Sequence, residues 1–255
     1  MSERDRYEPG VPCFVASMQP DPDAGAAFYA AVFGWEYVGE EFNLARVRGR
    51  AVAAVTPLPP NVDPKPDPAW MTDVAVASAD ETAEKARSAG GRALDPFDGP
   101  AGRMTVIEDP AGAAIVACER TSGAELVNEP GAWAMSSLST PDPEGAAAFY
   151  GAVFGWTTEE IAMGELQATM FRLPGYVGGE PEQPVSREVV ATMMRGEQAG
   201  WTPDFWVDDV DAAAEAAASH GGAVVAGPMD IPIGRTAVLA DLAGLPFTVT
   251  TIARH

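Results

Sequence analysis

Short apolar segments separated by polar turns run along the whole chain, and this pattern predicts many strands and few helices. Apolar runs bounded by Gly, Pro or Asp are typical of strands. In the first half they cover residues 11–17, 42–48, 51–57, 70–77, 105–108 and 113–118. In the second half they cover residues 132–138, 169–173, 201–207, 236–240 and 246–252. Helices are predicted over residues 80–89 and 211–219, each of which ends at a Gly-Gly pair.

A longer segment with helical periodicity occurs twice. PDPDAGAAFYAAVFGW, residues 20–35, returns as PDPEGAAAFYGAVFGW, residues 141–156, and twelve of the sixteen positions are identical. Asp21 is placed to cap the start of a helix, Pro22 suits its first position and Gly34 suits its end. The second copy carries the same signals. The chain is therefore two copies of one unit, in which the FY…FGW residues form a helix-packing motif.

Each half reads strand, helix, strands, helix, strands. This order predicts an α+β fold with the helices on one side of a curved sheet. We place the first unit at residues 1–125 and the second at residues 126–255. Residues 180–200 are extra in the second unit and predict either a short helix, a mobile flap or the cover of a sheet edge.

Charge and composition limit the partners. The 255 residues carry a net charge of −21, which argues against nucleic acid or an anionic membrane as a partner. No apolar run is long enough for a membrane span, and the polar N-terminus does not read as a signal peptide. Two cysteines, Cys13 and Cys118, suit a reducing compartment. We predict a cytoplasmic protein, either monomeric or homodimeric.

The spacing of several residues resembles a known superfamily. Each half contains D-x-x-x-x-x-x-F-Y-x-x-x-F-G-W, then a Trp-led strand and a helix closing at Gly-Gly, then G-R-x-x-x-x-x-D-x-x-G. This order resembles the vicinal oxygen chelate superfamily, which includes glyoxalases, bleomycin-resistance proteins and extradiol dioxygenases. The resemblance covers nearly the whole chain. It implies tandem βαβββ modules whose mixed sheets curl around a cavity that binds or transforms a small molecule.

The resemblance also implies where metal-using members place their ligands, normally His or Glu. The matching positions here carry Phe14, Met71, Val116, Met135, Thr202 and Thr248. None of these side chains is an imidazole or a carboxylate, whereas a divalent metal site needs three or four converging donors. The chain has only two histidines, His220 and His255. We therefore predict no metal and no other cofactor.

Two aspartates are candidates for acid–base chemistry. Asp73 and Asp204 each follow a ligand-equivalent position by two residues, so strand alternation turns them toward the cavity. Carboxylates in an apolar cavity have raised pKa values that suit proton transfer. The alternative is that each lies at a strand edge or pairs with an arginine such as Arg103 or Arg235.

A set of apolar and hydroxyl side chains is predicted to line the binding slot. Indoles stack on planar ligands, and methionine adapts to irregular ones. The set is Phe14, Trp70, Met71, Met135, Ser137, Trp201, Thr202 and Trp206. Ordinary core packing is the alternative for each of them.

Two functions follow from this sequence, and a third is weaker. The first is a metal-independent protein that sequesters or presents a hydrophobic aromatic natural product, in resistance or biosynthesis. The second is a metal-independent isomerase, lyase or oxygenase acting on an aromatic polyketide-like substrate, with Asp73 or Asp204 as acid or base. The third is an inactive or purely structural paralogue.

Overall fold

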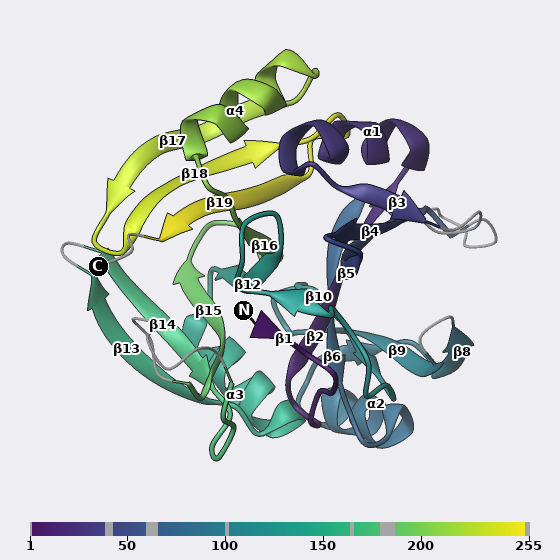
Figure 1. Cartoon of the computed structure of the whole chain (residues 1–255). Coiled ribbons are helices and arrows are strands. Elements are labelled where there is room, and N and C mark those ends of the chain that lie inside the picture. Colours follow the sequence, from purple (N-terminus) through teal and green to yellow (C-terminus); the bar gives the residue numbers. More distant parts are fainter. Residues whose placement is uncertain are drawn as a thin grey trace.

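The apolar segments of each half assemble into one curved, mixed sheet, and the two sheets lie side by side (Figure 1). The structure is a computed structural model that describes residues 2–38, 43–59, 66–99, 102–163, 166–178 and 187–252. The predicted α+β class, the two tandem units and their curved mixed sheets are confirmed.

The first sheet is centred on the antiparallel pair β2 and β6. Its strands, in spatial order, are β3 (Glu36–Val38), β4 (Asn43–Val47), β5 (Arg50–Pro57), β2 (Pro12–Gln19), β6 (Ala69–Ala75), β10 (Ala114–Cys118), β9 (Gly102–Glu108) and β7 (Arg92–Ala93), with β8 (Phe97–Gly99) beside β9. Helix α1 (Pro22–Phe33) follows β2 and helix α2 (Ala79–Ser88) follows β6. The β-α-β-β-β order therefore occurs twice within this half.

The second sheet repeats this arrangement around the antiparallel pair β12 and β16. Its spatial order is β13 (Thr157–Met163), β14 (Leu166–Arg172), β15 (Val189–Arg195), β12 (Trp133–Thr140), β16 (Gly200–Trp206), β19 (Pro246–Ile252), β18 (Gly234–Ala240) and β17 (Ala223–Ile231). Helix α3 (Pro143–Phe154) follows β12 and helix α4 (Val210–Ser219) follows β16. A short ladder joins β1 (Ser2–Glu3) to β11 (Leu126–Val127).

The repeated helix has the ends that the sequence predicts. The Asp21 carboxylate accepts a hydrogen bond from the Ala24 N–H at 3.0 Å, Pro22 begins α1, and Gly34 ends it with a left-handed φ of 70°. Helix α3 has the same ends, with Asp142 as its cap and Gly155 in the left-handed conformation. These residues fix where each helix starts and stops, and hence how its aromatic side chains are aimed.

The aromatic side chains of each repeated helix pack against the other half of the chain. Helix α1 lies beside α4, and α3 lies beside α2 (Figure 1). The Tyr29 hydroxyl donates to the Asp241 carboxylate at 2.7 Å, and the Tyr150 hydroxyl donates to Asp109 at 3.2 Å. The FY…FGW segment is thus a packing motif, as predicted, and the packing it makes joins the two halves.

The Gly-Gly pairs leave room for the aromatic side chains that each half inserts into the other. A Cβ atom on Gly91 would lie 2.5 Å from the ring of Phe149, and one on Gly222 would lie 2.7 Å from the ring of Phe28. Real Cβ atoms do not approach other atoms so closely. A glycine is therefore required wherever the partner half inserts its phenylalanine.

The extra segment of the second unit differs from the prediction. Residues 187–200 form no helix: Val189–Arg195 is β15, which pairs with β12 on one side and β14 on the other. Apolar side chains explain why the strand forms: the adjacent Val190 and Ala191 are both buried although they point to opposite faces, and Met193 is buried as well. Within the described residues, no helix is long and apolar enough to cross a membrane.

Candidate functional site

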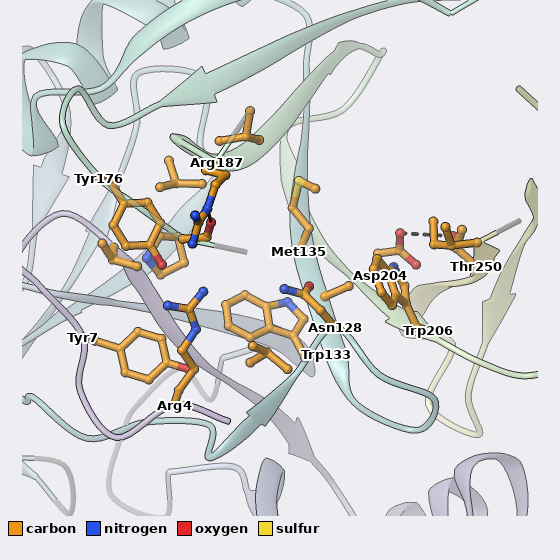
Figure 2. A pocket seen from close by; sticks show the side chains of 18 of the residues that line it. Arg4, Tyr7, Asn128, Trp133, Met135, Tyr176, Arg187, Asp204, Trp206 and Thr250 are labelled. Carbon is orange, nitrogen blue, oxygen red and sulfur yellow. Dashed lines mark hydrogen bonds between the residues drawn. The ribbon is translucent and has the colours of Figure 1, made fainter. Parts of the chain in front are cut away.

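A cavity of about 130 Å³ lies inside the curve of the second sheet. The residues that line it include Arg4, Tyr7, Asn128, Trp133, Met135, Tyr176, Arg187, Val190, Asp204, Trp206, Ile233, Thr250 and Ile252. They come from β12, β15, β16 and β19, from the N-terminal segment of the first half, and from the loops that hold Asn128, Tyr176, Arg187 and Ile233. Figure 2 shows these side chains pointing toward a common space.

Aromatic rings form much of this wall. Trp133 on β12 and Trp206 on β16 face the cavity from the sheet, and Tyr7 and Tyr176 face it from the segments that cross its mouth (Figure 2). The Tyr7 hydroxyl donates to the Ala124 carbonyl at 2.7 Å, which fixes its ring. Flat rings on several sides suit a planar ligand, because such rings stack on it.

Two arginines also reach this space. The Arg4 guanidinium carbon lies 6.0 Å from the centre of the Tyr176 ring, within the range of a cation–π contact. The exposed Arg187 donates through Nε to the Gly178 carbonyl at 2.9 Å. Two guanidinium groups are therefore part of the lining of the cavity, although the protein as a whole is acidic.

Asp204 is the carboxylate among the lining residues. Its Oδ2 accepts a hydrogen bond from the Thr250 hydroxyl at 3.1 Å. Its Oδ1 is shielded from solvent and has no hydrogen-bond partner within the described residues. Burial raises the pKa of Asp204 from 3.8 to about 7, and the Thr250 hydrogen bond opposes the shift. A carboxyl with this pKa is partly protonated near neutral pH.

Asp73, the counterpart in the first half, has a different environment. Its Oδ2 lies 3.2 Å from the Arg120 guanidinium, which in turn stacks 4.9 Å from the centre of the Phe14 ring. Burial raises the pKa of Asp73 to about 6, while Arg120 opposes that shift. This ion pair occupies the position that the cavity occupies in the second half. Arg103 and Arg235, the partners suggested by the sequence, instead pair with Asp80 and Asp211.

The remaining predicted residues divide by location. Met135, Asp204 and Trp206 line the cavity. The Trp70 indole donates to the Tyr29 hydroxyl at 3.1 Å, and the Trp201 indole donates to Tyr150 at 3.0 Å, so both lie in the packing between the halves. The others, which do not line this cavity, are Phe14, Met71, Ser137 and Thr202.

Most of the lining residues were not predicted, among them Trp133, Arg4, Tyr7 and Tyr176. Trp133 lies two residues before Met135 on the same strand, so strand alternation from Met135, a position given by the family resemblance, is a signal that could have found it. Arg4, Tyr7 and Tyr176 lie in irregular segments, and they reach the cavity only through the tertiary arrangement of the halves. No local pattern marks them.

Comparisons with known proteins agree with this fold. A family model described as a glyoxalase-like domain matches residues 14–118 and again 122–250. The chain is 40% identical over 263 residues to the putative glyoxylase CFP32 of Mycobacterium bovis, covering 98% of this chain and 97% of the relative. It is 30% identical over 268 residues to the anthracycline biosynthesis protein DnrV of Streptomyces peucetius, covering 97% and 95%.

A solved structure with the same fold holds a metal. The Mn(II)-bound glyoxalase from Novosphingobium aromaticivorans superposes with a TM-score of 0.64 at 17% identity, covering 98% of this chain and 83% of that chain. In the described part of the present chain, no group of three or more His, Cys, Asp or Glu side chains gathers closely enough to hold a metal ion. Among the cavity-lining side chains, Asp204 is the one strong anionic donor. This set does not fit a divalent metal.

Proposed function

We propose that this chain, which belongs to the glyoxalase-like domain family, binds a hydrophobic aromatic small molecule in the cavity of its second half without a metal ion. The observation that carries the proposal is the cavity itself, with Trp133, Trp206, Tyr7 and Tyr176 around it. The relation to a protein named for anthracycline biosynthesis supports a role in sequestering or presenting an aromatic natural product. Metal independence, a cytoplasmic location and the oligomeric state remain predictions.

The size of the cavity limits what it encloses. A cavity of about 130 Å³ is close to the roughly 150 Å³ that accepts one benzene ring in an engineered protein core. One ring of a ligand therefore fits inside. Further rings of a polycyclic ligand extend through the mouth, past Arg4 and the exposed Arg187. There the guanidinium planes offer stacking surfaces.

The first half has no equivalent site in this proposal. Arg120 stacks on Phe14 and pairs with Asp73, so the aspartate of the first half, unlike Asp204, is held by a cation. One ligand per chain is the expected stoichiometry, despite the internal repeat.

Replacing Trp206 by alanine tests the location. We expect this variant to bind 1-naphthol about tenfold more weakly than the unmodified protein, because a stacking aromatic wall contributes on the order of 1 kcal/mol beyond area burial. Calorimetric titration measures both the affinity and the number of sites. Phe97→Ala, an exposed aromatic of the first half, is the control and should leave the affinity unchanged. Two sites per chain, or equal losses in both variants, would contradict the proposal.

A second candidate function is acid–base catalysis at the same site. Asp204 favours it, because this carboxyl is part of the cavity lining, has no cationic partner among the described residues and has a pKa of about 7. A general base with that pKa abstracts a proton next to a carbonyl and returns it to a neighbouring atom, as an isomerase does. Asp73 is less suited, since Arg120 holds it.

Proton exchange separates the two candidate functions. If Asp204 is a base, the protein accelerates exchange of the acidic C–H protons of 2-tetralone, an aromatic ketone, with D₂O. We expect Asp204→Asn to lose this acceleration about a hundredfold while it still binds the ketone. Asp73→Asn is the matched control and should retain it. Exchange is followed by NMR. The same slow exchange with and without the unmodified protein would leave binding as the function.

A further inference from the structure

The two cysteines of this chain lie together in the fold although they are far apart in the sequence. Cys13 and Cys118 are the only cysteines among the 255 residues, and both are free and fully buried. Their strands, β2 and β10, lie on either side of β6 (Figure 1). Neither residue lines the cavity of the second half. The pair therefore has no part in the proposed function.

Both thiols reach the same stretch of β6. The Cys13 thiol donates to the Asp73 carbonyl at 3.4 Å, and the Cys118 thiol donates to the next carbonyl, that of Val74, at 3.7 Å. The pairing of β2 with β6 shifts register at Cys13, and such a bulge re-aims the side chain of its extra residue. The Cys118 side chain also makes a hydrogen-bonding contact with Cys13. This contact and burial raise the pKa of the Cys13 thiol well above its usual value.

The backbone does not allow this pair to form a disulfide. Strand β6 lies between β2 and β10 and pairs with both, which sets the backbones of the two cysteines two strand spacings apart, about 9.5 Å. A disulfide needs Cα atoms within about 7 Å of each other. Closing it would require the strand pairing of β6 to break. One ion held between the two sulfur atoms, by contrast, would leave that pairing intact.

We propose that Cys13 and Cys118 form a two-coordinate site for one Cu(I) ion, independent of the proposed function. Thiolates select soft cations such as Cu(I), whereas a structural Zn²⁺ site needs four ligands. Two sulfur donors are compatible with the described residues, which hold no group of three or more His, Cys, Asp or Glu side chains suited to a metal. Neither cysteine occupies a position at which the metal-using members of the superfamily place a ligand.

Binding exchanges two protons for one ion. Each thiol releases its proton to water, because a metal binds the thiolate, and the two new bonds are sulfur–copper bonds. The Asp73–Arg120 ion pair lies beside Cys13, and its two charges act on the Cys13 thiol in opposite directions. The complex therefore depends on the soft metal–sulfur bonds rather than on a counter-ion. A hollow of about 250 Å³, lined in part by Arg120 and by Ala75, the register partner of Cys118, gives the ion a path inward.

Copper retention by the whole protein tests this site. The reduced protein is mixed with excess Cu(I) without oxygen and passed through gel filtration in excess glutathione, a competing thiol. We expect one Cu(I) per chain to remain, with two sulfur neighbours in X-ray absorption. Its binding should raise the midpoint of thermal unfolding, because an ion that binds only the folded chain stabilises it. Zn²⁺ treated in the same way should leave at least tenfold less metal on the protein.

Two variants assign the copper to the two sulfur atoms. Cys13→Ala and Cys118→Ala each remove one sulfur and keep a small apolar side chain. Each should retain at least tenfold less Cu(I) than the unmodified protein and lose the rise in the thermal midpoint. Met194→Leu, which removes an exposed sulfur of the second half, is the control and should retain the full equivalent.

Three results would overturn this inference. The first is that the unmodified protein retains no Cu(I), which decides the matter even if a variant does not fold. The second is that either cysteine variant retains a full equivalent. The third is that diamide forms a disulfide between Cys13 and Cys118 in the folded protein, which would make the pair a redox switch. None of these results bears on ligand binding in the second half.

Discussion

Replacing Asp241 by alanine is expected to destabilise the protein by about 4 kcal/mol, the largest effect of any single change considered. Oδ1 of this buried carboxylate accepts from the N–H groups of Ala243 and Leu245, both at 2.9 Å, and so shapes the final turn. Oδ2 accepts from Tyr29 and Gln19 of the other half. Alanine would leave four donors without their acceptor in a buried place, where each costs on the order of 1 kcal/mol or more.

Urea unfolding measures the loss in the free energy of unfolding. Two further variants show how much each group of hydrogen bonds contributes to it. Asp109→Ala removes the equivalent carboxylate, which accepts three hydrogen bonds rather than four, and should cost less. Tyr29→Phe removes one of the bonds to Asp241 and also leaves the Trp70 indole N–H without its acceptor, and should cost about 2 kcal/mol. If the free energy of unfolding of Asp241→Ala lies within about 1 kcal/mol of that of the unmodified protein, the Asp241 carboxylate does not stabilise the contact between the halves.

Replacing Arg120 by methionine is expected to cost about 3 kcal/mol at pH 8. Methionine keeps most of the contact with the Phe14 ring but leaves Asp73 as a buried carboxylate with no cation. Breaking one partner of a buried ion pair is strongly destabilising for this reason. The pKa of Asp73, already about 6, should rise further, because Arg120 is the group that opposes the shift.

The sign of the pH dependence follows from that shift. A carboxyl whose pKa is higher in the folded than in the unfolded protein binds its proton more tightly when folded, so stability falls as pH rises from about 4 through the folded pKa. The loss caused by Arg120→Met should therefore be large at pH 8 and small at pH 5, where Asp73 is protonated. Thermal unfolding at both values checks this. The double variant Arg120→Met, Asp73→Asn should recover most of the stability at pH 8; no recovery would mean that packing, not charge, explains the loss.

Much of the fold could be predicted from the sequence. The repeated segment carries the residues that begin a helix, apolar residues at helical spacing, and the glycine that ends it. The strands that were missed lack such patterns. β17 is largely exposed and is interrupted by Gly227 and Pro228, so it shows no alternation of apolar and polar residues. β15 follows a polar, Gly- and Pro-rich stretch, which made the whole insertion resemble a loop.

Only part of the site could be predicted from the sequence, because alternation along a strand gives the face of a residue but not which segments cross that face. Strand alternation correctly brings Met135 and Asp204 to the cavity wall. It also separates neighbours: Trp201 and Thr202 are adjacent, so they point to opposite faces of β16, and Trp201 turns toward α3. Tyr7 lies before the first predicted strand, in a segment for which the sequence predicts no element, and only the path of the folded chain brings it to the cavity.

The reciprocal contacts between the halves have a consequence for the origin of the chain. The Trp35 indole donates to the Gly131 carbonyl at 2.7 Å, and the Trp156 indole donates to the Gly10 carbonyl, also at 2.7 Å. Each half thus donates to the other through the same tryptophan of its repeated segment. Such reciprocal contacts are typical of an isologous two-fold dimer. The polypeptide is therefore organised as a fused dimer. Because the two halves are joined in one polypeptide, their equivalent positions need not be alike: Asp204 lines a cavity, whereas Asp73 pairs with Arg120.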